Sequence, residues 1–317
     1  MKKIFKFLFP LTVLLAMGIL IINSKVCSYG FKRGLKLWGL TVLPSTLPFL
    51  FLSNVLFFTL DMQKVSKKLS KTGKIFGLNG VSVYIFICAL LSGYPVGARL
   101  TSSAKKEGLL DEKQALKTAI LSSACSSVFI ISVVGEQLFS SKKIGFFIYL
   151  SHFLSLLIST SIASVFYESN YTATVVPFKE KKQNLLYDCV FSAVKTALII
   201  GGFITIFSVL IEVANFLKIN VAFAKIFSLL LDEKTAKALF WGLIESSGGV
   251  KAISDAGQSA LHAALCAFTL SFGSFSVISQ SLAFLSDEKF NKKVFVSFKA
   301  LQGIISFLIT LLLLKIF

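Results

Sequence analysis

The stretch that decides the fold is SGYPVGAR at residues 92–99, which interrupts an apolar segment in the first half of the chain. Pro95 lacks a backbone N–H, and its ring clashes with the preceding turn, so a regular helix cannot run through it undisturbed. Gly93 and Gly97 allow dihedral angles and close approaches that other residues resist. The pattern therefore predicts a broken helix inside an apolar region.

The second half of the chain carries a similar interruption, ESSGGVKA at residues 245–252. Each interruption is followed by a serine-rich apolar stretch, LSSACSSV at 121–128 and LSFGSFSV at 270–277. An unwound helix frees backbone N–H and C=O groups that lipid cannot satisfy, so they must face protein, water or a solute. Interrupted segments at corresponding positions of two halves therefore indicate the binding site of a transporter.

The composition identifies a membrane protein. The chain is 55% hydrophobic, and only 15% of its residues are charged, against about 25% in a soluble domain. Its mean hydropathy is +0.80. Apolar runs of about 20 residues, long enough to cross a hydrocarbon core of about 30 Å, recur along the chain. We expect an all-α polytopic membrane protein with about eight to nine transmembrane or re-entrant helices, arranged as two repeated halves with broken helices.

The expected organisation has four parts, which are an N-terminal membrane anchor span in 1–30, a first repeat in 31–166, a polar connector in 167–189 and a second repeat in 190–317. If every segment crosses the membrane, the repeats are parallel; if one segment of each half is re-entrant, they are inverted. The sequence leaves both topologies open. The expected spans are 4–22, 36–60, 81–102, 114–135, 144–166, 190–217, 235–253, 258–285 and 294–317.

The net charge of +18 favours a lipid partner over a nucleic acid. The cations gather in short loops between apolar spans, as in 64–74, where they set topology and meet anionic headgroups. No basic stripe with interleaved aromatic residues indicates nucleic-acid binding. No P-loop, GxSxG or HExxH motif is present, so we do not expect an enzyme. The scattered cysteines, together with His152 and His262, indicate packing rather than a metal site.

The candidate solute-binding residues lie in the two interruptions and in the serine-rich stretches. Serine hydroxyls can line a polar pore or can simply allow close helix packing, and the sequence leaves both readings open. The candidates are Ser92, Gly93, Tyr94, Pro95, Gly97, Arg99, Ser122, Ser126, Glu245, Ser246, Gly248, Gly249, Lys251, Ser274, Ser276 and Gln280.

Two cations stand at matched positions, Arg99 two residues after Gly97 and Lys251 two residues after Gly249. A charge near the interior of a span is costly unless paired or hydrated, which makes it a functional candidate. Snorkelling to the interface is the alternative. If both cations point inward, they would share one cavity and suit a small anion with two carboxylates. Glu245 could carry a proton or coordinate Na⁺, and no cofactor is expected.

The chain resembles a known family. SGYPVGAR, followed by KKEGLLDEKQA at 105–115 and a serine-rich apolar helix, is similar to the YlbJ-type sporulation integral membrane proteins, which are grouped with proteins carrying the nucleoside-recognition Gate domain. GLIESSGGVKAIS at 242–254 and LSFGSFSVISQ at 270–280 are similar to the C-terminal half of that family. The resemblance covers 35–317.

The resemblance implies a multi-pass protein of the cell membrane or of a membrane surrounding the forespore. It implies transport of a small organic solute, an anion such as dipicolinate, during endospore formation. A transporter of nucleoside-type solutes and a non-transporting scaffold for spore envelope assembly are the alternatives. The sequence also leaves a homo-oligomer open.

Overall fold

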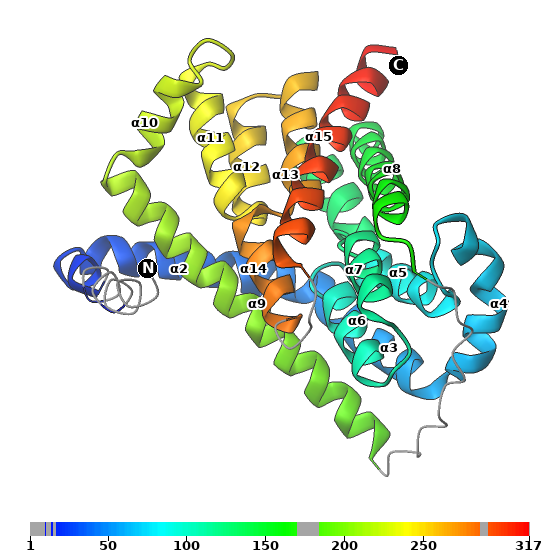
Figure 1. The fold of residues 1–317 in the computed structure, drawn as a ribbon. Helices are drawn as coiled ribbons and strands as arrows, with labels where there is room; N and C mark the ends of the chain where they lie inside the picture. Colours follow the sequence, from blue (N-terminus) through cyan, green and yellow to red (C-terminus); the bar gives the residue numbers. More distant parts are fainter. Residues whose placement is uncertain (1–9, 11–13, 15–16, 170–183, 286–290, 317) are drawn as a thin grey trace.

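The computed structural model of the chain describes residues 10, 14, 17–169, 184–285 and 291–316. Within these residues all regular structure is helical, as predicted. Figure 1 shows several long helices around a group of shorter ones. The predicted first span, 4–22, and the predicted connector, 167–189, lie largely outside the described residues.

Five helices of the described chain are long and apolar enough to cross a membrane. The first runs continuously from α2 (Ser24–Leu37) through the π-helical η1 (Trp38–Val42) to α3 (Leu43–Thr59). The others are α8 (Lys142–Phe166), α9 (Leu185–Phe216), the pair α13 (Ala260–Phe272) with α14 (Ser274–Phe284), and α15 (Lys292–Ile316). A sixth span exists if α4 (Met62–Ile75) and α5 (Gly80–Ser92), which meet at 88°, count as one.

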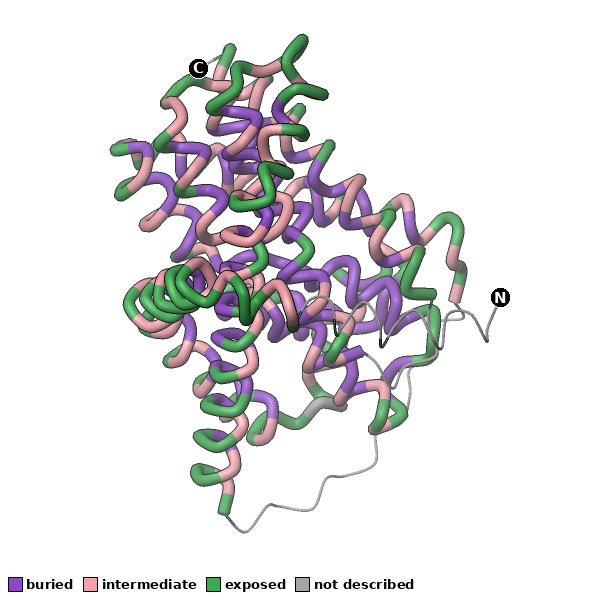
Figure 2. Tube along the Cα trace, turned by 90° about the vertical axis from the view of Figure 1, so that its left-hand side faces the viewer, coloured by how far each residue is buried: buried purple, intermediate pink, exposed green. Residues whose placement is uncertain are grey.

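The outward face of α9 is apolar, which is the reverse of a helix on a soluble protein. Leu198, Ile206 and Leu210 are exposed, whereas Ala197 and Ser208 are buried. Figure 2 shows buried residues concentrated in the middle of the molecule and exposed ones at its periphery. An exposed surface of this composition is suited to lipid contact.

The first predicted break is confirmed in position. Helix α5 ends at Ser92, and α6 (Val96–Lys106) begins after Gly93, Tyr94 and Pro95. Gly93 adopts φ +77°, a left-handed conformation that a side chain would strain. With 13 residues α5 is about 20 Å long, which is too short to cross the membrane alone. It packs against α6. We call α5, the turn 93–95 and α6 the first hairpin.

The next segment is also interrupted. Helix α7 (Glu112–Leu121) begins at Asp111, whose carboxylate accepts the N–H of Gln114 at 2.6 Å. It ends at the serine-rich stretch 122–128, after which the π-helical η2 (Phe129–Leu138) continues. The predicted span 114–135 is therefore two short helices joined by an irregular segment.

The second predicted break lies earlier than expected. After α10 (Ile219–Ile226), helix α11 (Glu233–Ile244) ends at Glu245, and α12 (Ser246–Ala256) begins directly. The break falls at the first residue of the predicted interruption, 245–252, and Gly248 and Gly249 lie inside α12. The carboxylate of Glu245 caps α12, so the new helix starts before the glycines are reached. We call α11 with α12 the second hairpin.

The predicted number of about eight to nine spanning or re-entrant helices is not confirmed. The segments 81–102, 114–135 and 235–253 are each divided into halves that do not cross on their own. The two-fold repeat likewise stays a prediction at this point.

Substituting Gly249 with alanine should destabilise the hairpin of α11 and α12. A Cβ at Gly249 would run into the backbone of Gly242 on α11. Overpacking of this kind costs about 1–3 kcal/mol, which thermal unfolding of the purified protein in detergent should show. Gly202→Ala is the matched control, because nothing lies within 4 Å of a Cβ built there. Equal melting temperatures for the two variants would contradict the close helix contact.

Candidate functional site

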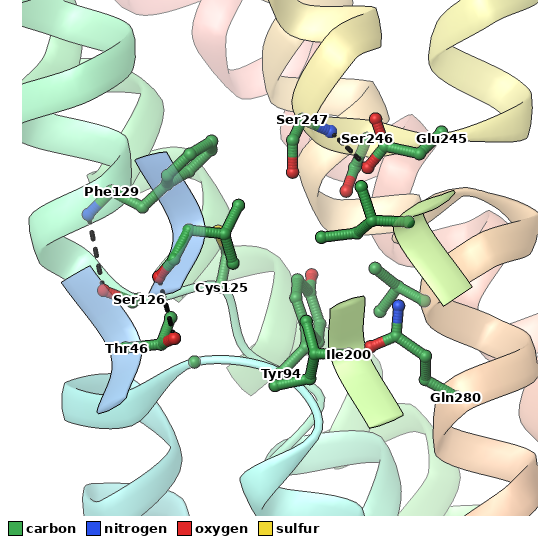
Figure 3. A pocket seen from close by; sticks show the side chains of 14 residues that line it. Thr46, Tyr94, Cys125, Ser126, Phe129, Ile200, Glu245, Ser246, Ser247 and Gln280 are labelled. Atoms are coloured by element: carbon green, nitrogen blue, oxygen red, sulfur yellow. Dashed lines mark hydrogen bonds between the residues drawn. The ribbon is translucent and has the colours of Figure 1, made fainter. Parts of the chain in front are cut away.

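The two breaks meet at one cavity. It has a volume of about 50 Å³, enough for a few water molecules. The hairpin of α5 and α6 contributes Gly93 and Tyr94, and the hairpin of α11 and α12 contributes 245–247. Figure 3 shows Ser126 and Thr46 on one side, Glu245, Ser246 and Gln280 on the other, and Tyr94 between them. The remaining lining residues are Val42, Cys125, Phe129, Ile200, Ile204, Ser247 and Val277.

The tip of the first hairpin is wedged between the two interrupted helices. A Cβ at Gly93 would come within 2.9 Å of Ser126, so the tip backbone lies directly on the stretch between α7 and η2. The hydroxyl of Tyr94 donates a hydrogen bond to the carbonyl oxygen of Leu270 near the end of α13. This bond satisfies a carbonyl at the place where α13 gives way to α14.

The tip of the second hairpin is built around a buried acid. Glu245 is 1% exposed, and its carboxylate accepts the N–H groups of Ser247 at 2.9 Å and Gly248 at 2.6 Å. These N–H groups belong to the first turn of α12, where the helix dipole favours negative charge. The fold thus provides internal partners for a carboxylate at the edge of the cavity.

Side chains from α8 and α15 form hydrogen bonds with the backbone of the irregular stretch between α7 and η2. Nε2 of His152 on α8 accepts the N–H of Cys125 at 3.0 Å, and Nδ1 lies 2.8 Å from the hydroxyl of Ser271. The tautomer protonated on Nδ1 fits both contacts. Nζ of Lys299 on α15 donates to the carbonyl oxygen of Ser123 at 3.2 Å. Backbone groups freed by the break therefore bond to side chains instead of facing lipid.

The second interrupted helix bends at Gly273, which has φ +82°. The hydroxyl of Ser274, the first residue of α14, donates to the carbonyl oxygen of Gly242 on α11. Nε2 of Gln280 lies 3.3 Å from the hydroxyl of Ser276, and Gln280 lines the cavity. The bond from Ser274 joins the kink to the second hairpin.

The structure brings together part of the predicted site. The predicted residues that line the cavity are Gly93, Tyr94, Ser126, Glu245, Ser246 and Gln280. The others support the breaks or lie elsewhere: Ser92 bonds Ser53 and Phe49 on α3, and Ser122 bonds back to Thr118 within its own helix. The remaining predicted residues outside the lining are Pro95, Gly97, Arg99, Gly248, Gly249, Lys251, Ser274 and Ser276.

The expectation that Arg99 and Lys251 share one cavity is wrong. The guanidinium of Arg99 donates to Asn54 on α3 and, at 3.1 Å, to Ser192 on α9. The side chain of Lys251 is 60% exposed and pairs with Asp255 at 3.0 Å. Residues two apart on a helix point about 200° away from each other. Because Gly97 and Gly249 face neighbouring helices, the cations two residues later face away from those contacts.

Sequence reasoning missed two residues that hold the site, His152 and Lys299. Lys299 is an isolated cation inside the apolar run 294–317, which is itself a signal of function in a membrane protein. His152 gave no sequence signal, because its partners Cys125 and Ser271 lie 27 and 119 residues away. Among the described residues no group of three or more His, Cys, Asp or Glu side chains could hold a metal ion.

Replacing His152 with leucine should lower the free energy of unfolding by about 1–3 kcal/mol, the cost of leaving a buried N–H unpaired. The N–H of Cys125 and the hydroxyl of Ser271 both lose their partner in this variant. Denaturant titration of the detergent-solubilised protein measures the change. Ser161→Ala is the control on the same helix, because that hydroxyl is exposed and bonds only its own helix. A His152→Leu protein as stable as the control would show that the break is satisfied in another way.

Comparison with known proteins gives one relative for the whole chain. The chain is 28% identical over 338 residues to the sporulation integral membrane protein YlbJ of Bacillus subtilis (strain 168), a match that covers 96% of this chain and 83% of the relative. No family model matches the chain, and no solved structure matches it. The predicted resemblance to the YlbJ-type proteins is confirmed. With the apolar helices, it identifies a multi-pass integral membrane protein.

Proposed function

We propose that this YlbJ-type membrane protein is a transporter that moves a small organic anion, such as dipicolinate, across a membrane surrounding the forespore during endospore formation. The observation that carries the proposal is the convergence of both broken hairpins on one cavity. Broken helices are stable inside a membrane only where protein or a water-filled cavity takes up their backbone groups. The best-attested use of such paired breaks is a solute site near the bilayer midplane.

The lining of the cavity suits a small organic molecule. Apolar side chains of Phe129, Ile200 and Val277 alternate with the hydroxyls of Ser126 and Thr46 and with other polar groups. Mostly apolar walls with a few placed polar groups are typical of sites for small molecules. The walls would contact the ring of an aromatic solute, and the polar groups would orient it.

The order of the elements supports two repeats. Each half has a long helix, a short helix, a hairpin, an interrupted helix and a final long helix. In this arrangement α5–α6 corresponds to α11–α12, α7–η2 to α13–α14, and α8 to α15. In Figure 1, α11 and α12 lie in the upper part of the view and α5 and α6 in the lower part.

Transport requires the cavity to open. A volume of about 50 Å³ holds a few water molecules but not an aromatic dicarboxylate. The two hairpins form opposite walls, so movement of either tip would admit solute from one side. Alternating movement of this kind is how inverted-repeat transporters expose a central site to each side in turn.

Uptake into vesicles containing the purified protein tests the function directly. We expect the vesicles to take up labelled dipicolinate, and Ser126→Phe to reduce uptake to background because the ring fills the cavity. Ser161→Phe on the exposed face of α8 is the matched control. Uptake of nucleosides in place of dipicolinate would change the solute class. Uptake of neither, by folded protein, would favour the non-transporting scaffold.

Cys125 offers a native reporter of solute at the cavity. A variant that keeps Cys125 and replaces the other four cysteines should react with a small aqueous thiol reagent whenever the cavity opens. Dipicolinate at ten times its Kd should slow that reaction about tenfold, because only unoccupied protein reacts. A variant that keeps only Cys266, which is equally buried but does not line the cavity, should show no protection. Protection of both thiols, or of neither, would argue against a solute at this cavity.

A further inference from the structure

The molecule buries a lysine that no described carboxylate neutralises. Lys299 is 1% exposed, and its polar contacts are the carbonyl oxygen of Ser123 and the amide oxygen of Gln302. The ring of Tyr94 lies against it, with Nζ 5.4 Å from the ring centroid. An ammonium group in a membrane protein is costly unless it is paired or hydrated. Among the described residues, Lys299 is therefore a cation stabilised only by neutral groups.

The coordination of Lys299 leaves room for a further acceptor. An ammonium group has three N–H donors, and the two hydrogen bonds, at 3.2 Å to Ser123 and 2.8 Å to Gln302, use two of them. Tyr94 offers the third donor only the face of its ring. A carboxylate oxygen would be a much better partner, because charge-assisted hydrogen bonds are about twice as strong as neutral ones.

Gln302 fixes the direction of the lysine. Its Nε2 donates to the carbonyl oxygen of Ile120 at 2.9 Å and lies 3.0 Å from the hydroxyl of Ser159. With the amide nitrogen held by two helices, the amide oxygen has one orientation left, and that orientation faces Nζ of Lys299. Gln302 is thus a positioning residue for the cation.

Lys299 lies directly behind the wall of the cavity. Tyr94, which covers it, lines the cavity, and Ser123 stands two residues before Cys125 in the lining stretch. The other notable cations are held elsewhere: Arg99 bonds Asn54 and Ser192, and Lys251 pairs with Asp255. Lys299 is therefore separated from the cavity by Tyr94, whose hydroxyl is bonded to Leu270.

We propose that Lys299 is the anion anchor of the transport site, donating its third N–H to a carboxylate of the solute once the side chain of Tyr94 moves aside. This inference rests on the proposed transport function and specifies the solute as a carboxylate. Glu245, in the second hairpin, does not oppose it strongly, because its charge is met by two N–H groups and the dipole of α12. In this structure, the ring of Tyr94 lies between the ammonium group and the cavity.

Binding to full-length protein in lipid nanodiscs tests the anchor, with two ligands of the same shape. Pyridine-2,6-dicarboxylate carries the charge, and pyridine-2,6-dicarboxamide does not. Lys299→Gln should weaken binding of the dicarboxylate about tenfold or more, the equivalent of one charge-assisted hydrogen bond. It should leave binding of the dicarboxamide unchanged. Lys299→Arg, which retains the charge, should recover most of the affinity for the dicarboxylate.

Lys117→Gln is the matched control. Lys117 is also 1% exposed, and it bonds the neutral oxygens of Gly77 and Ser169, neither of which lines the cavity. This variant should bind both ligands as the wild type does. If Lys299→Gln does not fold, Gln302→Leu takes its place, because it keeps the cation but frees its direction. Gln302→Leu should also weaken binding of the dicarboxylate more than binding of the dicarboxamide.

The outcomes separate the two proposals. Suppose that the wild type binds the dicarboxylate. If folded Lys299→Gln then binds it with the same affinity, or loses affinity for both ligands equally, the anchor proposal is wrong and the proposed transport function is unaffected. Equal losses for both ligands in Gln302→Leu would overturn the anchor proposal as well. Failure of the folded wild type to bind the dicarboxylate would remove the proposed anionic solute, and the anchor with it.

Discussion

The constraint on which this structure depends is that a broken helix in a membrane must find partners for its own backbone. Water is not present to accept freed N–H and C=O groups, and each unpaired group costs several kcal/mol. Side chains satisfy backbone groups at three of the breaks described here, and all but the Glu245 cap of α12 come from another helix. His152 accepts from Cys125, Lys299 donates to Ser123, Tyr94 donates to Leu270, and Ser274 donates to Gly242. These bonds join the two hairpins to the interrupted helices and to α8 and α15, and the cavity lies beside them.

This constraint also explains why the polar residues are confined to the centre. The exposed face of α9 presents leucine and isoleucine, so solvation of the breaks cannot come from the outside. Polar side chains instead point inward from α8 and α15, which pack against each other and against α13. Close packing at Gly249 and Gly93 allows these inward groups to reach their targets. Small residues at the helix contacts therefore help the polar side chains to form the hydrogen bonds that the breaks require.

The sequence predicted the helical membrane class and the existence of both interruptions, because hydropathy and Pro–Gly punctuation are local signals. It placed the first break correctly at Gly93–Pro95 and the second within 245–252, although a glutamate cap rather than the glycine pair ends α11. It found six of the residues that line the cavity, which lie at the two breaks and in the serine-rich stretches that follow them. It could not find His152, whose partner Cys125 lies 27 residues away in the chain, and it overlooked Lys299, whose charge inside an apolar run was a usable signal. The matched positions of Arg99 and Lys251 suggested a shared cavity, but matched positions in the sequence do not determine the direction in which each side chain points from its helix.

If the cavity is the solute site, as proposed, its internal hydrogen bonds would determine its selectivity. In this structure Glu245, Lys299 and Tyr94 already have partners within the protein. A solute that enters the cavity would break some of these hydrogen bonds, and its own polar groups would have to replace them. One that offers no matching group leaves a buried donor or acceptor unpaired, at a cost of about 1–3 kcal/mol for each. A site of this kind rejects analogues that lack the right polar groups far more strongly than an apolar pocket rejects a molecule of the wrong size. If the protein is a transporter, as proposed, the same bonds that hold the broken helices in the membrane would also set the chemistry of the solute.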